Sequence, residues 1–276
     1  MEAKIHLQAG RLPEALASLQ EAIRKAPADP SLRIFLFELL SVLGQWEKAL
    51  VQLQIIGELD TESFLLAQGF RPAIQCEVLR TEVFSGNRTP LIFGEPEPWI
   101  SQLVEANRLI ATGKFEPARS LREQAFEEAP AFAGSINGEP FEWIADADSR
   151  LGPVLEVILD GKYVWVPFSR ISAIQIESPK SLRDLIWIGA RFIWSNGGAA
   201  LGLIPVRYAG TDLAADSALR LARKTEWKQL DEGLFTGTGQ RMMATDKAEY
   251  PLQEIREIEI EQPQESLASP PSNATE

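Results

Sequence analysis

The chain has 276 residues, of which 45% are hydrophobic and 24% charged, enough to bury the cores of two domains of ordinary size. Its formal net charge of −12 disfavours binding to nucleic acid or to an anionic membrane surface and favours a basic or apolar polypeptide as partner. A single cysteine excludes an intramolecular disulfide, and with no signal-peptide pattern and no stretch of about 18 apolar residues we expect a cytoplasmic protein.

Three short blocks of the sequence match one another and indicate a helical repeat. They begin at Gly10, Gly44 and Gly113, and each reads Gly, any residue, Leu or an aromatic, two further residues and Ala. The first two begin 34 residues apart, which is the period of the tetratricopeptide repeat (TPR), a helix-turn-helix unit. Such units stack on one another and leave a groove that binds another polypeptide.

The N-terminal half follows this pattern. Apolar residues at helical spacing predict two hairpins over residues 3–59, a longer helix over 62–85 and a degenerate repeat over 99–129. The prolines between residues 89 and 98 disfavour helix in the residues before them, so we expect an ordered loop there.

The second half changes to patterns typical of β-strands. Runs of β-branched and aromatic residues predict six strands, over residues 154–159, 163–166, 171–176, 185–194, 201–208 and 255–260. Asp160-Gly161 predicts a hairpin between the first two, and residues 214–222 predict one short helix. The fold class is therefore α+β. We expect a TPR-like domain over 1–130, a small, mainly antiparallel β domain or open barrel over 138–261, and a disordered tail over 262–276.

The repeat register predicts which side chains face the groove. The first helix of each hairpin contributes them, and they are Lys4, Leu7, Glu38, Ser41, Asn107, Ile110 and Lys114. The alternative is a helical scaffold that only supports the β domain.

Asp146, Asp148 and Arg150 resemble a calcium-binding loop at first sight. An EF-hand loop needs glycine at position 6 and a carboxylate at position 12. Counted from Asp146, these positions hold Leu151 and Val157, so the calcium interpretation fails. We expect instead that Asp146 or Asp148 pairs with Arg150.

Two other groups of residues are open to two interpretations each. Tyr163 and Trp165 share one face of a predicted strand, which is either core or an exposed binding hot spot. Arg183, Asp184 and Arg207 stand among apolar residues. This favours a buried ion pair over a recognition site for a charged side chain of a partner.

The sequence contains no complete catalytic pattern. His6 is the only histidine, Cys76 lies in an apolar helix, and no Gly-Lys-Ser/Thr phosphate-binding sequence occurs. We therefore predict no catalytic residues, no metal and no cofactor. The alternative is a small-ligand or metal-dependent hydrolytic site that uses Asp146, Asp148 and Glu156.

Several ordered motifs of the second half resemble one protein family. The sequence is similar to the ImpE family (also called SciE or TagJ) in six segments, residues 143–156, 161–167, 182–187, 205–208, 223–227 and 239–241. With the helical half, the resemblance covers roughly residues 1–260. The charged and aromatic residues of these motifs are candidates for structural or binding roles: Trp143, Asp146, Asp148, Arg150, Glu156, Tyr163, Trp165, Arg183, Asp184, Trp187, Arg207, Tyr208 and Arg241.

The resemblance implies a role in the bacterial type VI secretion system. Members of the family are non-enzymatic and associate with the contractile sheath of that machine. It further implies binding to an N-terminal helix of the small sheath subunit (TssB) and an influence on sheath assembly or on recycling by the ClpV unfoldase. A structural adaptor in an unrelated complex is the alternative.

Overall fold

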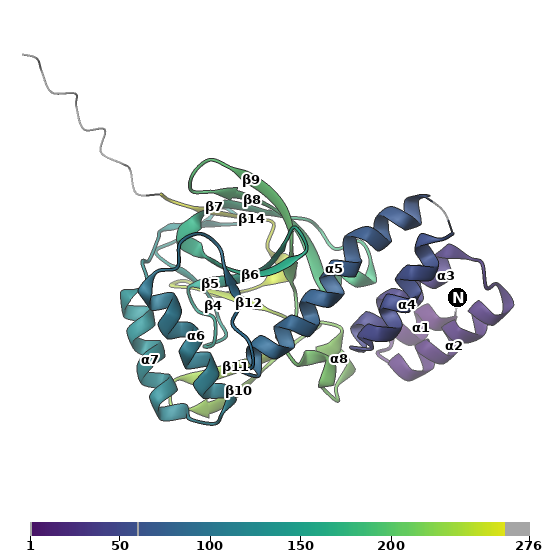
Figure 1. Cartoon of the computed structure of the whole chain (residues 1–276), viewed down its shortest axis with the longest axis horizontal. Coiled ribbons are helices and arrows are strands. Elements are labelled where there is room, and N and C mark those ends of the chain that lie inside the picture. Colours follow the sequence, from purple (N-terminus) through teal and green to yellow (C-terminus); the bar gives the residue numbers. More distant parts are fainter. Residues whose placement is uncertain (1, 60, 263–276) are drawn as a thin grey trace, which may run out of the picture.

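Two helical hairpins form the N-terminal end of the protein (Figure 1). The computed structural model describes residues 2–59 and 61–262; the predicted tail lies, from residue 263 onward, outside the described residues. The hairpins consist of α1 (Glu2–Gln8) with α2 (Leu12–Lys25) and α3 (Pro30–Val42) with α4 (Trp46–Gly57). The two predicted TPR-like hairpins are confirmed.

Local sequence explains where these helices begin and end. Gly10 and Gly44 adopt left-handed φ values of 72° and 68°, which glycine reaches without a steric cost, and each closes a hairpin turn. Asp29 caps α3, since its carboxylate accepts a hydrogen bond of 2.8 Å from the backbone N–H of Ser31.

The predicted long helix is α5 (Thr61–Phe84), which runs from the hairpins to the sheet (Figure 1). There it packs against the turn of a β-hairpin, where the Cys76 thiol donates a 3.3 Å hydrogen bond to the carbonyl of Gly161. Burial raises the pKa of this thiol to about 12, so it is not a reactive thiolate. The predicted degenerate repeat is α6 (Pro98–Ala111) with α7 (Phe115–Glu128), which pack on each other.

A nine-stranded sheet forms the centre of the second half. Its strand order is β1-β6-β5-β9-β8-β7-β14-β2-β3. Its strands are β1 (Leu91–Ile92), β2 (Gly134–Ile136), β3 (Glu139–Phe141), β5 (Val154–Leu159), β6 (Lys162–Pro167), β7 (Ile171–Ile176), β8 (Trp187–Trp194), β9 (Ala199–Pro205) and β14 (Glu257–Ile260). All pairs are antiparallel except β1 with β6.

Two small sheets and one short helix complete the fold. A two-stranded sheet pairs β10 (Thr225–Asp231) with β11 (Leu234–Gly239). A three-stranded sheet has the order β13-β12-β4, formed by β13 (Glu249–Pro251), β12 (Met242–Thr245) and β4 (Ile144–Asp146). The predicted short helix is α8 (Ser217–Arg220).

The sequence analysis was correct about the fold class and incomplete about the strands. The six predicted strands are present: β5 and β7 have the predicted bounds, and the other four have shifted ends. Asp160-Gly161 forms the predicted turn, with φ values of 47° and 70°. Strands β2 to β4 and β10 to β13 were missed. Strands β2, β3, β4 and β13 have three residues each and β12 has four, too few for an alternating pattern to be recognised, and polar and glycine residues interrupt the apolar pattern of β10 and β11. The loop predicted over residues 89–98 contains β1, which pairs with β6.

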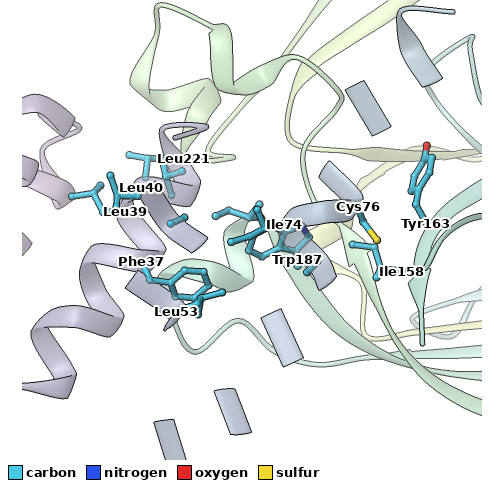
Figure 2. Packing of buried hydrophobic residues seen from close by; sticks show 14 of the residues in the cluster. Phe37, Leu39, Leu40, Leu53, Ile74, Cys76, Ile158, Tyr163, Trp187 and Leu221 are labelled. Carbon is cyan, nitrogen blue, oxygen red and sulfur yellow. The ribbon is translucent and has the colours of Figure 1, made fainter. Parts of the chain in front are cut away.

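The larger hydrophobic core joins the helical and β-rich parts (Figure 2). It runs from Phe37 and Leu53 of the second hairpin, through Ile74 of α5, to Ile158 and Trp187 of the sheet. A second core lies within the β-rich part, around residues such as Val166, Phe192 and Ile258. The predicted boundary at residues 131–138 stays a prediction, since the first core crosses it.

In the part of the chain that the structure describes, we find no helix with the length and apolar character needed to cross a membrane.

The contact between α5 and the β-hairpin turn gives a first testable prediction. A Cβ atom added to Gly161 would lie 2.9 Å from Cβ of Pro72, at a residue whose φ is already 70°. We expect Gly161→Ala to lower the free energy of unfolding by more than the about 1–2 kcal/mol of left-handed strain alone, measured by urea denaturation.

Gly197→Ala is the matched control. Gly197 has a φ of 82°, and an added Cβ would meet no heavy atom within 4 Å, so this variant carries backbone strain without a clash. Equal losses in the two variants would contradict a close contact between α5 and the turn.

Candidate functional site

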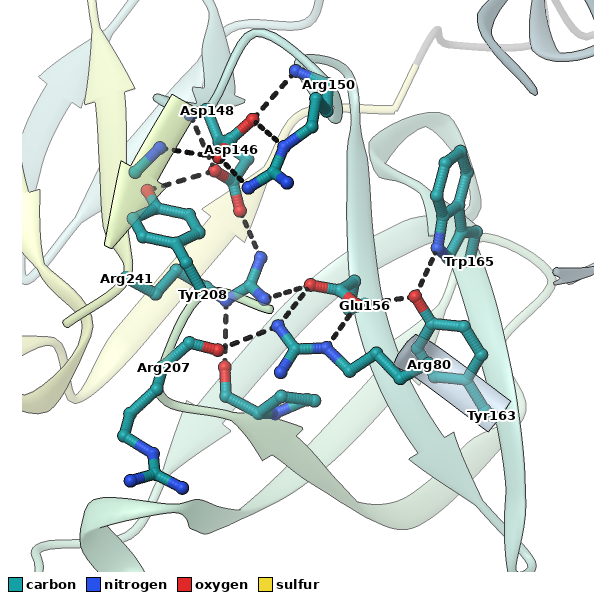
Figure 3. Close-up of polar contacts among 12 residues, drawn as sticks. Arg80, Asp146, Asp148, Arg150, Glu156, Tyr163, Trp165, Arg207, Tyr208 and Arg241 are labelled. Carbon is teal, nitrogen blue, oxygen red and sulfur yellow. Dashed lines mark hydrogen bonds and ion pairs between the residues drawn. The ribbon is translucent and has the colours of Figure 1, made fainter. Parts of the chain in front are cut away.

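Glu156 of β5 lies at the centre of a buried charge network (Figure 3). Arg80 of α5 binds its carboxylate with two nitrogens, at 2.6 and 2.8 Å. Arg241 forms a second ion pair with the same carboxylate, and the Tyr163 hydroxyl donates a further hydrogen bond to it at 2.5 Å. Glu156 and Arg241 are both fully buried, so neither charge has access to solvent.

The network continues to the loop that follows β4. Arg241 also pairs with Asp146, whose carboxylate accepts the backbone N–H of Asp148 at 2.8 Å. Asp148 in turn forms a two-point ion pair with Arg150, at 2.6 and 2.9 Å, and accepts the N–H of Gly237 at 2.8 Å. The predicted pairing of Asp148 with Arg150 is confirmed, and the partner of Asp146 is Arg241.

Burial and neighbouring charges move the pKa values of the two central acids in opposite directions. Burial raises the pKa of Glu156, but Arg80 and Arg241 together outweigh it and lower that pKa to about 2. For Asp146, burial outweighs the single arginine partner, and the pKa rises to about 6. Glu156 is therefore an anion held by two cations.

This arrangement leaves the acids little chemical freedom. Asp146, Asp148 and Glu156, the residues of the hydrolytic alternative, each bind an arginine and are buried. Among residues 2–59 and 61–262, no three His, Cys, Asp or Glu side chains form a group that could hold a metal ion. The network therefore joins α5, β5 and the segments around β4 and β12 without presenting a reactive group.

The aromatic residues of the family motifs are core rather than surface. Tyr163 and Trp165 are buried, and the indole N–H of Trp165 donates to the Tyr163 hydroxyl at 2.7 Å. Trp187 is buried and donates to Glu77 at 2.9 Å, and the buried Tyr208 hydroxyl accepts the N–H of Met242. Trp143 differs, since it is 39% exposed and lines an apolar surface cavity of about 340 Å³ beside α7.

The expected ion pair among Arg183, Asp184 and Arg207 is not formed. Asp184 instead caps the short 3-10 helix η2 (Leu182–Leu185). Arg183 pairs with Glu38 of α3 at 2.6 Å, a partner 145 residues away in the sequence. Arg207 is buried and binds backbone carbonyls rather than a carboxylate, and burial lowers its pKa to about 10.

Two arginines of the β-rich half bind the C-terminal ends of the first helices of the hairpins. Arg207 donates to the carbonyls of Ser41 and Val42 in α3, at 3.3 and 2.9 Å. Arg223 donates to the carbonyls of Leu7 and Gln8 in α1, at 3.2 and 3.0 Å. Cations are favourable at helix C-termini, where carbonyl groups lack partners and the helix dipole is negative. These contacts fix the hairpins on the β-rich half.

A surface groove of about 470 Å³ lies between α1, α3 and the segment before η2. Of the seven predicted groove residues, Lys4, Leu7 and Glu38 line it. Its other apolar lining residues are Ile34, Phe35 and Leu182, and its other polar ones are Gln8, Ser31, Lys180 and Ser181. The helical repeat therefore does carry a groove, but one of its walls belongs to the β-rich half.

The other four predicted groove residues lie elsewhere. Ser41 is fully buried and its hydroxyl donates to Phe37, so it does not face the groove. Asn107 is buried and donates to the carbonyl of Arg150, while Ile110 is half-buried and Lys114 exposed on the separate α6–α7 pair. The prediction treated the third hairpin as a continuation of the first two, whereas α5 separates them.

Sequence reasoning missed Arg80 and Lys180. Arg80 is three residues after Glu77 in an otherwise apolar stretch of α5, a spacing that could have indicated a buried charged pair. Lys180 carried no signal, because its place beside α1 depends on the tertiary fold.

The stacked hairpins and their groove place this chain among helical-repeat proteins, with a β-rich half attached. Comparisons with known proteins agree with this class. A family model described as tetratricopeptide repeat matches residues 6–68, and one described as ImpE protein matches residues 138–259. The type VI secretion system accessory component TagJ of Pseudomonas aeruginosa is 51% identical over 255 residues, which are 92% of this chain and 89% of that protein. The chain belongs to the ImpE (TagJ) family.

The fold is also found in a solved structure. A crystal structure of a protein from Vibrio parahaemolyticus matches with a TM-score of 0.87 at 27% sequence identity. The match covers 96% of this chain and 99% of the other. The arrangement of hairpins, α5 and sheet is thus shared at this level of sequence divergence.

Removing the charge of Glu156 tests the network. Glu156→Gln would leave Arg80 and Arg241 without their shared anion, and breaking one partner of a buried ion pair costs about 3–5 kcal/mol. We expect this loss in the free energy of unfolding, measured by urea denaturation at neutral pH. Glu257→Gln, at an exposed residue of β14, is the control and should change stability by less than about 0.5 kcal/mol.

Comparing the native protein with Glu156→Gln at different pH values gives a further prediction. Because the pKa of Glu156 is about 2 when folded and 4.5 in its ordinary state, its charge stabilises the fold above pH 4.5 and this contribution is lost as the pH falls toward 2. The stability difference between the native protein and Glu156→Gln should shrink over that interval. A difference that stays constant down to pH 2 would contradict the lowered pKa.

Proposed function

We propose that this protein is a non-enzymatic adaptor of a bacterial type VI secretion system. In this proposal it binds an N-terminal helix of the small sheath subunit, of the TssB type, in the groove between α1, α3 and residues 180–182. The groove is the observation that carries the proposal. The support for its biological setting is the 51% identity to a type VI secretion system accessory component.

The lining of the groove suits a helix with one apolar face. Leu7, Phe35 and Leu182 supply apolar surface, and polar residues lie around them. Helix-in-groove recognition uses apolar anchors at positions i, i+3 or i+4 and i+7 of the bound helix. A groove of about 470 Å³ is in the size range of sites that receive such anchor side chains.

Adaptor action follows from holding the sheath helix. A helix held in the groove is withheld from other contacts of the sheath subunit, so binding would modulate sheath assembly or recycling by the ClpV unfoldase. This role places the protein in the cytoplasm, with the sheath. The arginine-bound acids of the buried network support a non-enzymatic role, since each already has a structural partner.

Two substitutions on α1 test the groove. Leu7 lines the groove, whereas Ile5 is 61% exposed and does not line it. We expect Leu7→Glu to weaken binding of the N-terminal helix peptide of the small sheath subunit at least tenfold in calorimetry, since it places a charge on the apolar floor. Ile5→Glu makes the same chemical change on the same helix and should leave the dissociation constant within about twofold.

The full chain is required for this measurement, because residues 180–182 form one wall of the groove. Circular dichroism should show that both variants keep their helices. Failure of the native protein to bind the peptide or the assembled sheath would contradict the proposed function, and equal weakening by both substitutions would place the site elsewhere.

A further inference from the structure

The groove has a basic rim on a strongly acidic protein. Lys4 of α1 and Lys180 of the segment before η2 line it from different halves of the chain. Both side chains are exposed, and within residues 2–59 and 61–262 neither ammonium group has a hydrogen-bond or ion-pair partner. The chain as a whole carries a net charge of −12, so two unpaired lysines at one groove have the sign opposite to that of the protein overall.

The one acid in the groove does not neutralise these lysines. Glu38 is buried to 6% exposure, and its carboxylate is bound by Arg183 at 2.6 Å. The two other nearby acids on these elements, Glu2 and Asp184, do not line the groove. The lining side chains therefore carry two lysines against one carboxylate, which is itself paired with Arg183.

The wall that carries Lys180 is held in place before any ligand arrives. The carboxylate of Asp184 accepts the backbone N–H groups of Lys180 and Ser181, at 2.7 and 2.8 Å. Arg183, the residue before Asp184, ties the same segment to α3 through Glu38. On this wall of the groove the backbone therefore loses little conformational entropy when a ligand binds, and only the lysine side chain has to become fixed.

We propose that Lys4 and Lys180 select a partner helix that carries acidic side chains beside its apolar anchors. This inference rests on the proposed function and adds the charge pattern of the ligand. The apolar floor around Leu7 and Phe35 receives the anchors, and the two lysines meet carboxylates on either side of them. Complementary charges at the rim of an interface mainly set the association rate and the choice of partner.

The experiment compares two double variants with the same change in net charge. Lys4→Glu with Lys180→Glu reverses the rim, and Lys162→Glu with Lys228→Glu reverses two exposed lysines outside the groove. Binding is measured by calorimetry at low and high salt. The probes are the N-terminal helix peptide of the small sheath subunit from the same organism and the same peptide with each Asp and Glu replaced by Asn and Gln.

We expect the rim variant to bind the native peptide about tenfold more weakly at low salt, and the control variant to match the native protein within about twofold. The loss should diminish at high salt, because exposed charges are screened. The neutral peptide should bind the native protein and the rim variant alike.

Three results would overturn the proposal in distinguishable ways. Tight binding of the native peptide with no difference between the two double variants would refute the basic rim and leave the adaptor function intact. A difference that persists with the neutral peptide would show that the rim variant disturbs the groove rather than its charge. Failure of the native protein to bind either peptide would overturn the proposed function and this inference together.

Discussion

The carboxylate of Glu156 is the constraint on which the arrangement of the two halves depends. It lies in the central sheet and is fully buried, so its charge must be compensated by groups that other elements bring to it. Arg80 comes from α5, and Arg241 from the two-residue link between β11 and β12. Because each arginine also binds a second group, Arg207 O for Arg80 and Asp146 for Arg241, several segments can pack in only one relation to the sheet.

The charges of this region balance. The region has four buried or nearly buried arginines and four acids. Arg80, Arg150 and Arg241 pair with the acids at positions 77, 146, 148 and 156, and Arg207 binds backbone carbonyls. Burying ions costs desolvation energy that mutual attraction offsets only when geometry and hydrogen bonding are complete. A network of this kind is a poor source of reactive groups and a strong determinant of geometry. The groove beside α1 and α3, where we propose that the partner binds, lies outside it.

Local pattern was sufficient to predict much of the fold, and tertiary contacts explain the rest. The glycine turns, the 34-residue period, the helical spacing of apolar residues and Asp160-Gly161 are local signals. Together they predicted the first two hairpins, α5 and the β5–β6 hairpin. Strands β12 and β13 are only four and three residues long, and polar and glycine residues interrupt β10 and β11, so apolar alternation could not find them. The pairing of Arg183 with Glu38 spans 145 residues, and no spacing rule in one sequence reveals such a contact.

For the candidate site too, local pattern predicted one part and tertiary contacts decided the rest. Register on α1 and α3 correctly placed Lys4, Leu7 and Glu38 together, since helical periodicity decides which residues share a face. It wrongly placed the buried Ser41 there, and it could not show that α5 would carry the third hairpin away from the first two, nor that residues 180–182 would close the groove. Contributions from the second half of the chain could only be seen in three dimensions.

The hydrogen bonds that attach the hairpins to the β-rich half have an evolutionary consequence. Arg207 and Arg223 hold α3 and α1 by main-chain carbonyls, which every amino acid supplies. Substitutions on the ligand-facing side of these helices therefore leave these anchoring bonds unaltered. The residues that line the groove can therefore change in evolution while the attachment of the hairpins through these carbonyls is kept.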